Sequence, residues 1–234
     1  MTFWAFGDSF MSYDSNYIRQ MANSCNINQV HALGAPGSGL LFTYQQLLAN
    51  KDKILKDDVV LIGLSSPCRH IFGGQRNFMS SADWHVMLGG VSPSKTATKE
   101  QIDAGIKYFK YLYSDSHAGD LAHAVVSSIF HNVIPSLRTQ RVSAVITTDT
   151  DGYTNRFNVP NGLFEDLSLF NIIESYLIER KGFAKENRRA MMEQANGKNH
   201  WLEYEDYPEY FYSKIPRVLD ELGIKEIDYS SSLI

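Results

Sequence analysis

The sequence predicts an α/β fold in which helices cover both faces of a mainly parallel sheet. Residues 3–6 and 59–62 are apolar runs of the kind found in strands that are buried on both faces. Residues 40–48 instead carry apolar side chains three and four positions apart, which is the spacing of a helix packed on a sheet. Strands that alternate with such helices form right-handed βαβ units, and these build a parallel sheet.

The first half of the chain alternates strands with helices. The expected elements are, in order, a strand at 3–6, a helix at 17–25, a strand at 29–33, a helix at 40–48 and a strand at 58–63. Right-handed crossovers make the three strands parallel and align their carboxyl ends. We therefore expect Ser9, Gly37 and Ser65, which follow the three strands, to lie at one edge of the sheet.

The second half is predicted in less detail. The expected elements are a helix at 101–113, a helix from Leu121 to Val133 before Pro135, a strand at 142–147, either a strand plus a helix or one helix at 167–178, and a last helical stripe from Phe211 to Leu222 closed by Gly223. Turn residues between 66 and 115 indicate an insertion over the sheet edge. We expect one domain, 1–234, with a three-layer α/β/α architecture and a flavodoxin-like sheet of about five strands.

Composition narrows the classes of function. The chain has 26 acidic and 22 basic residues and a formal net charge of -4, whereas a nucleic-acid surface needs clustered Lys and Arg. Cys25 and Cys68 have no metal-ligand spacing and do not indicate a disulfide. No signal-peptide pattern is present, and no apolar run approaches the ~20 residues that cross a bilayer. We expect a soluble, cytoplasmic protein with no metal, organic cofactor, nucleic-acid partner or membrane partner.

The most informative motif is Gly7-Asp8-Ser9, which follows the first strand directly. Open α/β folds gather their chemistry at the carboxyl ends of the strands, so Ser9 is a candidate nucleophile there. A serine nucleophile needs a base within hydrogen-bond reach, and a histidine is the commonest one. The plainer interpretation is a strand-to-helix turn in which Asp8 or Ser9 caps the helix.

Four separated segments together resemble the SGNH (GDSL-like) hydrolase family. Gly7-Asp8-Ser9 resembles the first family block, and Gly37 in the turn after the second strand matches the glycine of the second. The third block, Gly-x-Asn-Asp in the family, reads Gly63-Leu64-Ser65-Ser66 here. The last block, Asp-x-x-His, reads Gly197-Lys198-Asn199-His200. The resemblance spans nearly the whole chain in the family order, with departures in the third and last blocks.

This resemblance implies that Ser9 attacks an acyl carbon and that His200 takes the serine proton, because His200 alone lies in a late loop before the last helix, as the family pattern requires. His70 is the alternative base. In the family an aspartate orients the histidine, but Gly197 stands at that position here. Asp149, which follows the fourth predicted strand, is one replacement for it. Glu205 and a backbone carbonyl are others, and a Ser-His pair acting alone is a further alternative.

The resemblance also implies a site for the oxyanion that forms during acyl transfer. Its donors are the backbone N–H groups of Ser9 and Gly37 and the hydroxyl of Ser65, which replaces the family asparagine. Ser66 is the neighbouring alternative, and both serines are also suited to capping the next turn. Arg69 is a candidate for binding an anionic part of the substrate, although the sequence somewhat favours an exposed surface position for it.

Three functions are compatible with these features. The first is a serine esterase or deacetylase that hydrolyses small acyl esters, including O-acetyl groups on carbohydrate, through an acyl-enzyme on Ser9. The second is a catalytically impaired protein of the same fold that binds a glycan or another protein. The third, a nucleotide or flavin binder, depends on the glycine-rich segment 34–39, which lacks both Gly-x-Gly-x-x-Gly order and a P-loop lysine and therefore ranks last.

Overall fold

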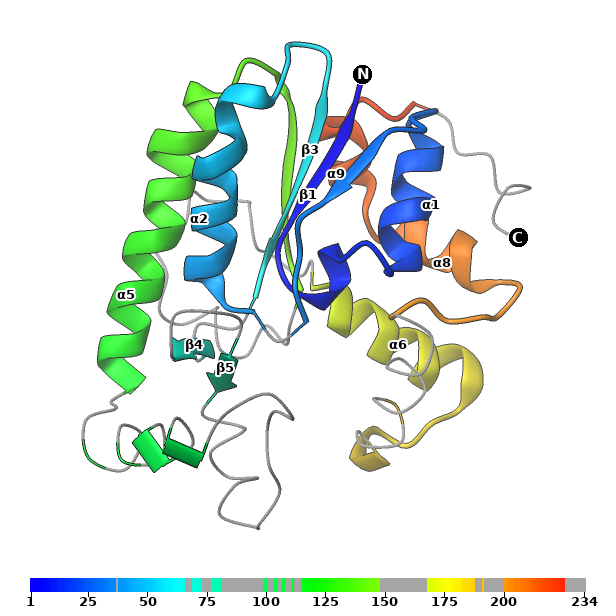
Figure 1. The fold of residues 1–234 in the computed structure, drawn as a ribbon. Coiled ribbons are helices and arrows are strands. Elements are labelled where there is room, and N and C mark those ends of the chain that lie inside the picture. The colour runs from blue at the N-terminus through cyan, green and yellow to red at the C-terminus, as the bar shows by residue number, and fades with distance from the viewer. Residues whose placement is uncertain are drawn as a thin grey trace.

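The described residues build a sheet of four parallel strands. The computed structural model describes residues 1–36, 38–65, 69–72, 77–80, 99–100, 103–104, 107, 111, 115–147, 168–187, 191 and 200–225. The strands are β1 (Phe3–Phe6), β2 (Val30–Ala32), β3 (Val59–Leu64) and β6 (Arg141–Ile146), and their order across the sheet is β2-β1-β3-β6 (Figure 1). All three pairings are parallel, which confirms the predicted α/β class.

The register aligns the strand ends. Phe3 at the start of β1 pairs with both Val30 and Val59, and Val59 pairs in turn with Arg141. The same alignment at the far ends of β3 and β6 pairs Leu64 with Ile146. The segments that follow the four strands therefore leave the sheet from one edge, which is where the sequence predicts the site.

Helices cover both faces of the sheet and complete the three layers. One face carries α1 (Asn16–Ser24), α6 (Leu169–Lys181), α8 (Tyr207–Ser213) and α9 (Pro216–Glu221), and the other carries α2 (Leu40–Asn50) and α5 (Asp115–Ser128) (Figure 1). Successive β1 side chains serve opposite cores, because side chains alternate along a strand: Phe3 packs with the first group of helices and Trp4 with the second. Short 3₁₀ turns, η2 (Lys51–Lys53) and η6 (Lys185–Asn187), lie after α2 and α6.

Ser168 extends the sheet by a single bridge before α6 begins. It forms a parallel bridge with Ile146 of β6, and its hydroxyl accepts a hydrogen bond from the Asn171 N–H at 3.2 Å, which caps the helix. Of the two interpretations of residues 167–178, the structure is therefore closer to a strand plus a helix, with the strand reduced to one bridging residue. The sheet of about five strands is represented, within the described ranges, by four strands and this bridge.

The prediction of one continuous helical stripe from Phe211 to Leu222 is wrong. The chain forms α8, leaves the helix at Lys214, and starts α9 with Pro216 at its first position. Proline has no N–H to donate and its ring clashes with the carbonyl four residues earlier, so it begins a helix more readily than it continues one. Gly223 adopts the expected left-handed conformation after α9, with φ of 70°.

The helix expected up to Val133 also changes character before Pro135. The α-helical part, α5, ends at Ser128 and continues as a π-helical turn, η3 (Ile129–Val133), and a 3₁₀ turn, η4 (Ile134–Ser136), which contains the proline. The π-helical turn is wider than an α-helix and the 3₁₀ turn is tighter. Together they accommodate Pro135, which has no N–H to donate to the regular hydrogen bonds of an α-helix. None of the helices within the described ranges is long and apolar enough to span a membrane.

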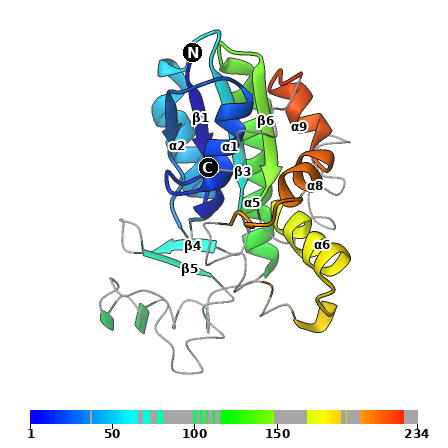
Figure 2. The same ribbon diagram turned by 90° about the vertical axis from the view of Figure 1, so that its right-hand side faces the viewer.

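The insertion around 66–115 contains a two-stranded antiparallel sheet. Its strands are β4 (Arg69–Phe72) and β5 (Asn77–Ser80), which both views place beyond the carboxyl ends of the main strands (Figure 2). Most of the helix expected over 101–113 lies outside the described residues. The hairpin shows that this connection leaves the main sheet and returns to it through α5.

Candidate active site

Ser9 lies at the carboxyl edge of the sheet, one tight turn after β1. It opens a 3₁₀ helix, η1 (Ser9–Met11), and it is half-buried. Gly7 brings this turn close to β3: a Cβ atom at position 7 would lie 2.6 Å from Met11 Cγ and 3.0 Å from the Gly63 carbonyl oxygen. A side chain at position 7 would therefore displace the turn that presents Ser9.

Met11 fills the space beneath this turn. It is fully buried, and a Cβ atom at Gly63 in β3 would lie 2.7 Å from its Cγ atom. The Gly34 N–H donates a hydrogen bond to the Met11 carbonyl at 3.0 Å, which ties the turn after β2 to η1. The buried Met11 side chain therefore packs η1 against the ends of β1 and β3.

Asp8 is part of the framework of this turn. It is 1% exposed, and one carboxylate oxygen accepts the Phe10 N–H at 3.1 Å, so the predicted capping role is observed for this residue. The other oxygen accepts the hydroxyl hydrogen of Thr147, directly after β6, at 2.7 Å. Asp8 therefore connects the carboxyl ends of β1 and β6, with β3 between them.

The glycine-rich turn after β2 meets the first turn at the same edge. The Ala35 N–H and the Ser38 hydroxyl both donate to the Gly7 carbonyl, at 3.1 Å and 2.9 Å. Ser38 is fully buried, so this second bond is shielded from water. Gly37, the predicted oxyanion donor, lies outside the described residues, whereas Ala35 and Ser38, on either side of it in the chain, are hydrogen-bonded to Gly7.

The third predicted position, Ser65, directly follows β3 and is fully buried. It lies beside the end of β6, because the Thr147 N–H donates to the carbonyl of the preceding Leu64 at 3.0 Å. Arg69 is the first residue of β4, and its side chain lies outside the described part of the chain. Asp149, the predicted orienting acid, also lies outside it.

The imidazole of His200 stacks on Phe10, the residue next to Ser9 in the chain. The two ring centroids are 4.1 Å apart and the ring planes differ by 15°. His200 is half-buried and adopts a left-handed backbone conformation, with φ of 67°. Residues that are nearly two hundred positions apart in the sequence thus meet at the carboxyl edge of β1.

The residue after His200 anchors this segment in the core. Trp201 is 5% exposed and makes edge-to-face contacts with Tyr207 and Phe211 of α8, with ring centroids 5.1 Å and 5.2 Å apart. Such aromatic pairs add about 1 kcal/mol to the apolar area that they bury. The buried indole therefore restricts the position of the neighbouring imidazole.

Polar contacts with α6 hold the next few residues of the same segment. Asp206 accepts hydrogen bonds from the Tyr176 hydroxyl and from Lys181 Nζ, the latter at 3.1 Å. Lys181 Nζ also lies 4.4 Å from the centroid of the Tyr204 ring, within the range of a cation–π interaction. Burial and the adjacent Asp206 carboxylate raise the pKa of Tyr176 to about 12, so this phenol stays protonated at neutral pH.

Three other histidines whose side chains the structure describes lie on strand β2, helix α5 and the turn η3. His123 lies on α5 and His131 in the turn η3 that follows it, as the helical pattern predicts. His31, in the edge strand β2, packs against the indole of Trp4 with ring centroids 4.4 Å apart. The backbone of His70, the alternative base, lies in β4, and its side chain falls outside the described atoms.

Sequence reasoning missed two residues that organise the site. Phe10 was passed over, although it directly follows the predicted nucleophile, because the motif identifies residue types and not the ring that packs on them. Thr147 ends the fourth predicted strand, and its place at the common edge was the available signal for a contact with Asp8. Glu205, considered as an orienting acid, is exposed in the turn before α8.

Within the described ranges, no three or more His, Cys, Asp or Glu side chains are grouped so that they could hold a metal ion. The chemistry available at the edge is that of a half-buried hydroxyl, an imidazole and backbone N–H groups. No protein-family model, curated protein or solved structure matches this chain.

Proposed function

We propose that this chain is a serine esterase or deacetylase of the SGNH type, in which Ser9 attacks small acyl esters and His200 acts as its base. O-acetyl groups on carbohydrate are one substrate class that suits this chemistry. The observation that carries the proposal is the stacking of the His200 imidazole on Phe10, the residue adjacent to Ser9. The sequence resemblance in four ordered blocks supports the same pair of residues independently.

The proposed reaction proceeds in two steps. His200 removes the hydroxyl proton as Ser9 attacks the acyl carbon, and it then donates that proton to the departing alcohol, which leaves an acyl-enzyme. A water molecule, deprotonated by the same imidazole, hydrolyses the acyl-serine and restores both side chains. Neither of the two proposed steps requires a metal ion or an organic cofactor.

The start of η1 supports a role for the backbone in stabilising the oxyanion. The first N–H groups of a helix have no acceptor within the helix, and Ser9 is the first residue of η1. The Asp8 carboxylate accepts a hydrogen bond from the N–H of Phe10, the residue after Ser9, and does not disturb the position of the Ser9 N–H at the start of η1. Gly37 is the second proposed donor and Ser65 is the third. Each of the three donors stabilises the transition state by an amount on the order of 3 kcal/mol.

The backbone of His200 also supports a functional role. A left-handed conformation costs roughly 1–2 kcal/mol in a residue with a Cβ atom, and glycine adopts it without that cost. The chain therefore carries an imidazole where a residue without a side chain would be more stable.

The group that orients the His200 imidazole is Asp149, Glu205 or a backbone carbonyl, or else Ser9 and His200 act as a pair alone. We prefer Asp149, because it follows β6, the strand whose end Asp8 connects to the site.

Hydrolysis of p-nitrophenyl acetate tests the proposal. The wild-type protein is expected to turn over, and Ser9→Ala is expected to lower kcat/KM at least about 1000-fold, because the nucleophile is lost. Ser12→Ala is the matched control: its hydroxyl is also close to the turn, but it donates to the Ser9 carbonyl at 2.8 Å and has no proposed role in attack. Equal rates for wild type and Ser9→Ala would refute the proposal.

A fluorophosphonate probe tests the base separately from the nucleophile. The probe is expected to label Ser9 in the wild type and to label His200→Asn much more slowly. Asparagine tolerates the left-handed conformation at position 200, so this variant removes the imidazole and keeps the chain path. Undiminished labelling of His200→Asn would assign the base to another residue.

A binding protein that keeps this fold without turnover is the second candidate. It is favoured by the third block, where the short, fully buried Ser65 replaces the asparagine that supplies an oxyanion donor in the family. A wild-type protein that is silent towards esters and fluorophosphonate but retains glycans on an array would favour this function. Rapid turnover would exclude it.

A further inference from the structure

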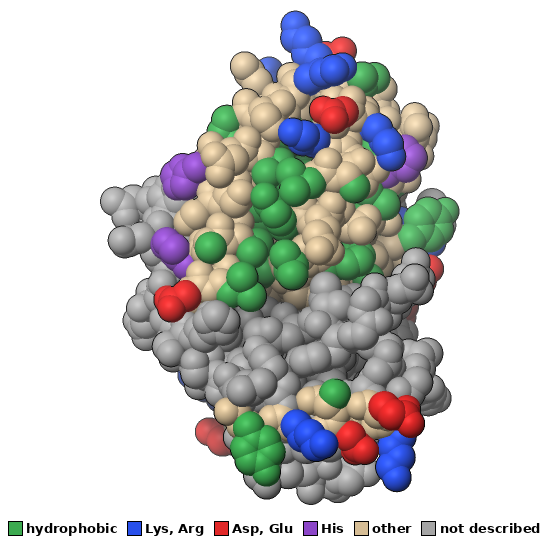
Figure 3. All heavy atoms as spheres, turned by 60° about the vertical axis from the view of Figure 1, so that its left-hand side comes forward, with side chains coloured by type: hydrophobic (Ala, Val, Ile, Leu, Met, Phe, Trp, Pro, Cys, Tyr) green, Lys and Arg blue, Asp and Glu red, His purple; other side chains and the backbone are tan. Residues whose placement is uncertain are grey.

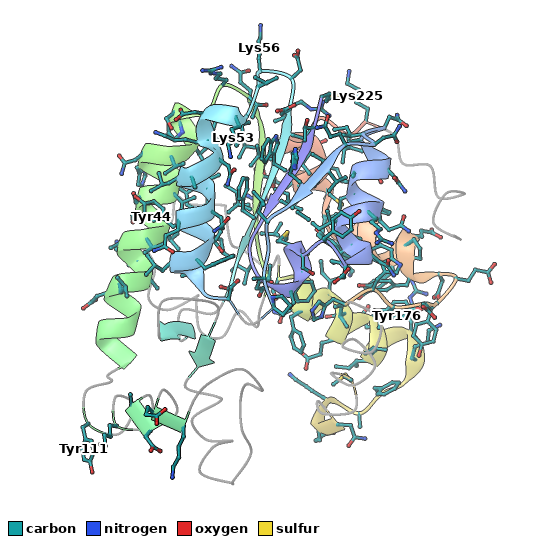
Figure 4. All side chains as sticks on the ribbon, in the orientation of Figure 1. Tyr44, Lys53, Lys56, Tyr111, Tyr176 and Lys225 are labelled. Carbon is teal, nitrogen blue, oxygen red and sulfur yellow. The ribbon has the colours of Figure 1, made fainter. Side chains whose placement is uncertain are left out.

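Two acidic side chains are buried within the described residues, one at each end of the sheet. Asp58 directly precedes β3 and follows Lys56, which Figure 4 shows at the end of the molecule opposite α6, and the Asp58 carboxylate accepts hydrogen bonds from N–H groups. Asp8 lies at the other end, beside Ser9, and accepts from the hydroxyl of Thr147 as well as from an N–H group. The hydroxyl donor therefore distinguishes the buried acid at the candidate site.

Thr147 reaches Asp8 across the intervening strand β3. A Cβ atom at Gly63 in β3 would lie 2.7 Å from Met11 Cγ and 2.8 Å from Thr147 Cγ2, so these two side chains meet in the space that a side chain at position 63 would fill. The glycine therefore allows strands β1 and β6, which are not neighbours in the sheet, to be joined by a direct hydrogen bond.

Thr147 is itself held in place at the end of β6. Its N–H donates to the Leu64 carbonyl at 3.0 Å, which continues the pairing of β3 with β6. Its hydroxyl oxygen is 2.7 Å from Asp8 Oδ2 and 3.4 Å from the Leu64 carbonyl oxygen, so the single hydroxyl hydrogen favours the carboxylate. Thr147 is fully buried, and water therefore does not compete for this bond.

Asp8 passes this fixed point on to the turn that carries Ser9. The second carboxylate oxygen accepts the Phe10 N–H at 3.1 Å, and the Asp8 carbonyl accepts the Met11 N–H at 3.0 Å, so the two residues that follow Ser9 are both bonded to Asp8. Capping a turn needs only one side-chain oxygen, which serine or asparagine supplies without the cost of burying a carboxylate. The other oxygen of Asp8 therefore has a separate use, which is the bond to Thr147.

We infer that Thr147 is a positioning residue for the reaction proposed above: its hydroxyl, acting through Asp8, holds the Ser9 turn at a fixed place relative to the end of β6. The inference rests on the proposed function, because it needs Ser9 to be the nucleophile. Asp149, the preferred orienting acid, comes two positions after Thr147 in the chain, so the same bond links the Ser9 turn to the start of the segment that carries the acid. Because a small misplacement of a reacting group is costly, loss of this bond lowers the rate of attack more than it weakens ester binding.

Hydrolysis of p-nitrophenyl acetate by variants at position 147 tests the inference. Thr147→Val keeps the shape of the side chain but removes the hydroxyl, and we expect kcat to fall about 10- to 100-fold while KM stays within about 2-fold of the wild type. Thr147→Ser keeps the hydroxyl and removes the methyl group that lies above Gly63, and it is expected to retain at least about half of the wild-type kcat. Labelling of Ser9 by a fluorophosphonate probe is expected to slow in parallel with kcat.

Ser143→Ala is the matched control. Ser143 lies in β6 four positions before Thr147, or about 13 Å along the strand, and its buried hydroxyl also donates to a carboxylate, that of Glu221. Ser143→Ala and Thr147→Val are both expected to unfold at lower urea concentrations than the wild type, but only Thr147→Val is expected to lose kcat. Both positions are buried, so neither variant changes the exposed surface, which Figure 3 shows from the side of α2 and α5.

Thr147→Cys serves if Thr147→Val does not fold. A thiol is a weaker donor than a hydroxyl but leaves the Asp8 oxygen partly satisfied, so kcat is expected to lie between those of the wild type and Thr147→Val. Wild-type kcat in a folded Thr147→Val or Thr147→Cys, or a loss shared equally by Thr147→Ser or Ser143→Ala, would overturn the inference and leave the proposed function standing. Failure of both Thr147→Val and Thr147→Cys to fold would make Thr147 a purely structural residue and would also overturn it. A wild type no faster than Ser9→Ala would instead refute the proposed function, and the inference with it.

Discussion

Phe10 joins the two residues on which the proposed chemistry depends. Its backbone follows Ser9 directly, its N–H is fixed by Asp8, and its ring supports the His200 imidazole. In the family that the sequence resembles, an aspartate orients the histidine, but Gly197 stands at that position here. Stacking on a buried ring restricts the tilt of the imidazole without a second charged group.

Replacing Phe10 with leucine should separate this positioning role from folding. Leucine keeps most of the buried volume, but it removes the flat surface beneath the imidazole. We expect kcat for p-nitrophenyl acetate to fall about 10- to 100-fold, because a small misplacement of a catalytic group is costly, while KM changes little. Phe10→Tyr keeps the ring and should retain most of the activity. Equal losses in both variants, or a change confined to KM, would contradict this role.

The sequence predicts the ends of strands more reliably than the contacts of side chains. Ser9 and Ser65 lie at one edge because each follows a buried apolar run whose end is clear from the residues alone. The bond between Asp8 and Thr147 joins positions with no local relationship in the sequence, and so does the stacking of Phe10 on His200. Such contacts depend on how crossovers stack the strands, which a periodic pattern does not encode.

Among the elements, helices were predicted well where one side is apolar and poorly where proline interrupts the pattern. The stripe over 211–222 has the period of one helix, yet Pro216 divides it into α8 and α9. Apolar residues keep their spacing across the break because both short helices pack on the same core. The period therefore reports the buried side of a segment and does not by itself show that the helix is continuous.

The end of α6 offers a direct measure of what a left-handed cap contributes. Gly182 has φ of 70° and donates its N–H to the carbonyls of Leu177 and Ile178. A Cβ atom at this position would meet nothing within 4 Å, so Gly182→Ala changes only the backbone preference. We expect this variant to lose about 1 kcal/mol of unfolding free energy in urea titrations.

Gly223, after α9, provides the comparison for that measurement. Its φ is also 70°, but a Cβ atom there would lie 3.1 Å from Arg141 Nε, which itself donates to the Leu222 carbonyl at 2.8 Å. Gly223→Ala should therefore lose more stability than Gly182→Ala, because it adds crowding to the backbone cost. An equal loss would mean that the arginine moves aside without cost.

For the whole molecule, the central sheet was the most predictable feature. Its two central strands β1 and β3 are apolar on both sides, since their side chains alternate between two cores, and this composition is visible in a single sequence. The insertion around 66–115 was predictable as a long connection but not as a path, because its turns do not fix which segments pair. Its β4–β5 hairpin appears only in the structure.

Asp58 connects several parts of the molecule at the opposite edge of the sheet. Its carboxylate accepts hydrogen bonds from the Thr2 N–H at 2.7 Å, the Trp4 indole at 3.0 Å and the Leu55 N–H at 2.9 Å. Burial alone would raise the pKa of Asp58, but these donors outweigh it and hold the pKa below its ordinary value. The ionised form therefore stabilises the native state more than the unfolded one.

The sign of this shift sets the pH dependence of folding. The contribution of Asp58 is complete above its unfolded pKa of about 3.9, and it is lost as the pH falls from there through the lower folded pKa. Asp58→Asn should lower the unfolding free energy at pH 7 by about 2 kcal/mol, since an amide nitrogen cannot accept these bonds. Its stability should also decline less than that of the wild type between about pH 4 and 3. Parallel declines of the two proteins in urea titrations would contradict this account.

The burial of Met11 beneath the Ser9 turn couples the interior of the protein to the candidate site at its surface. The Met11 side chain lies against the backbone at Gly7 and Gly63, and Met11 is two residues from Ser9, so the volume of the core and the position of the proposed nucleophile depend on one side chain. Enlarging Gly63 by one methyl group would push Met11 toward the surface and shift Ser9 with it. Efforts to make this protein more heat-resistant by filling its core should therefore begin on the α2 and α5 side, away from this methionine.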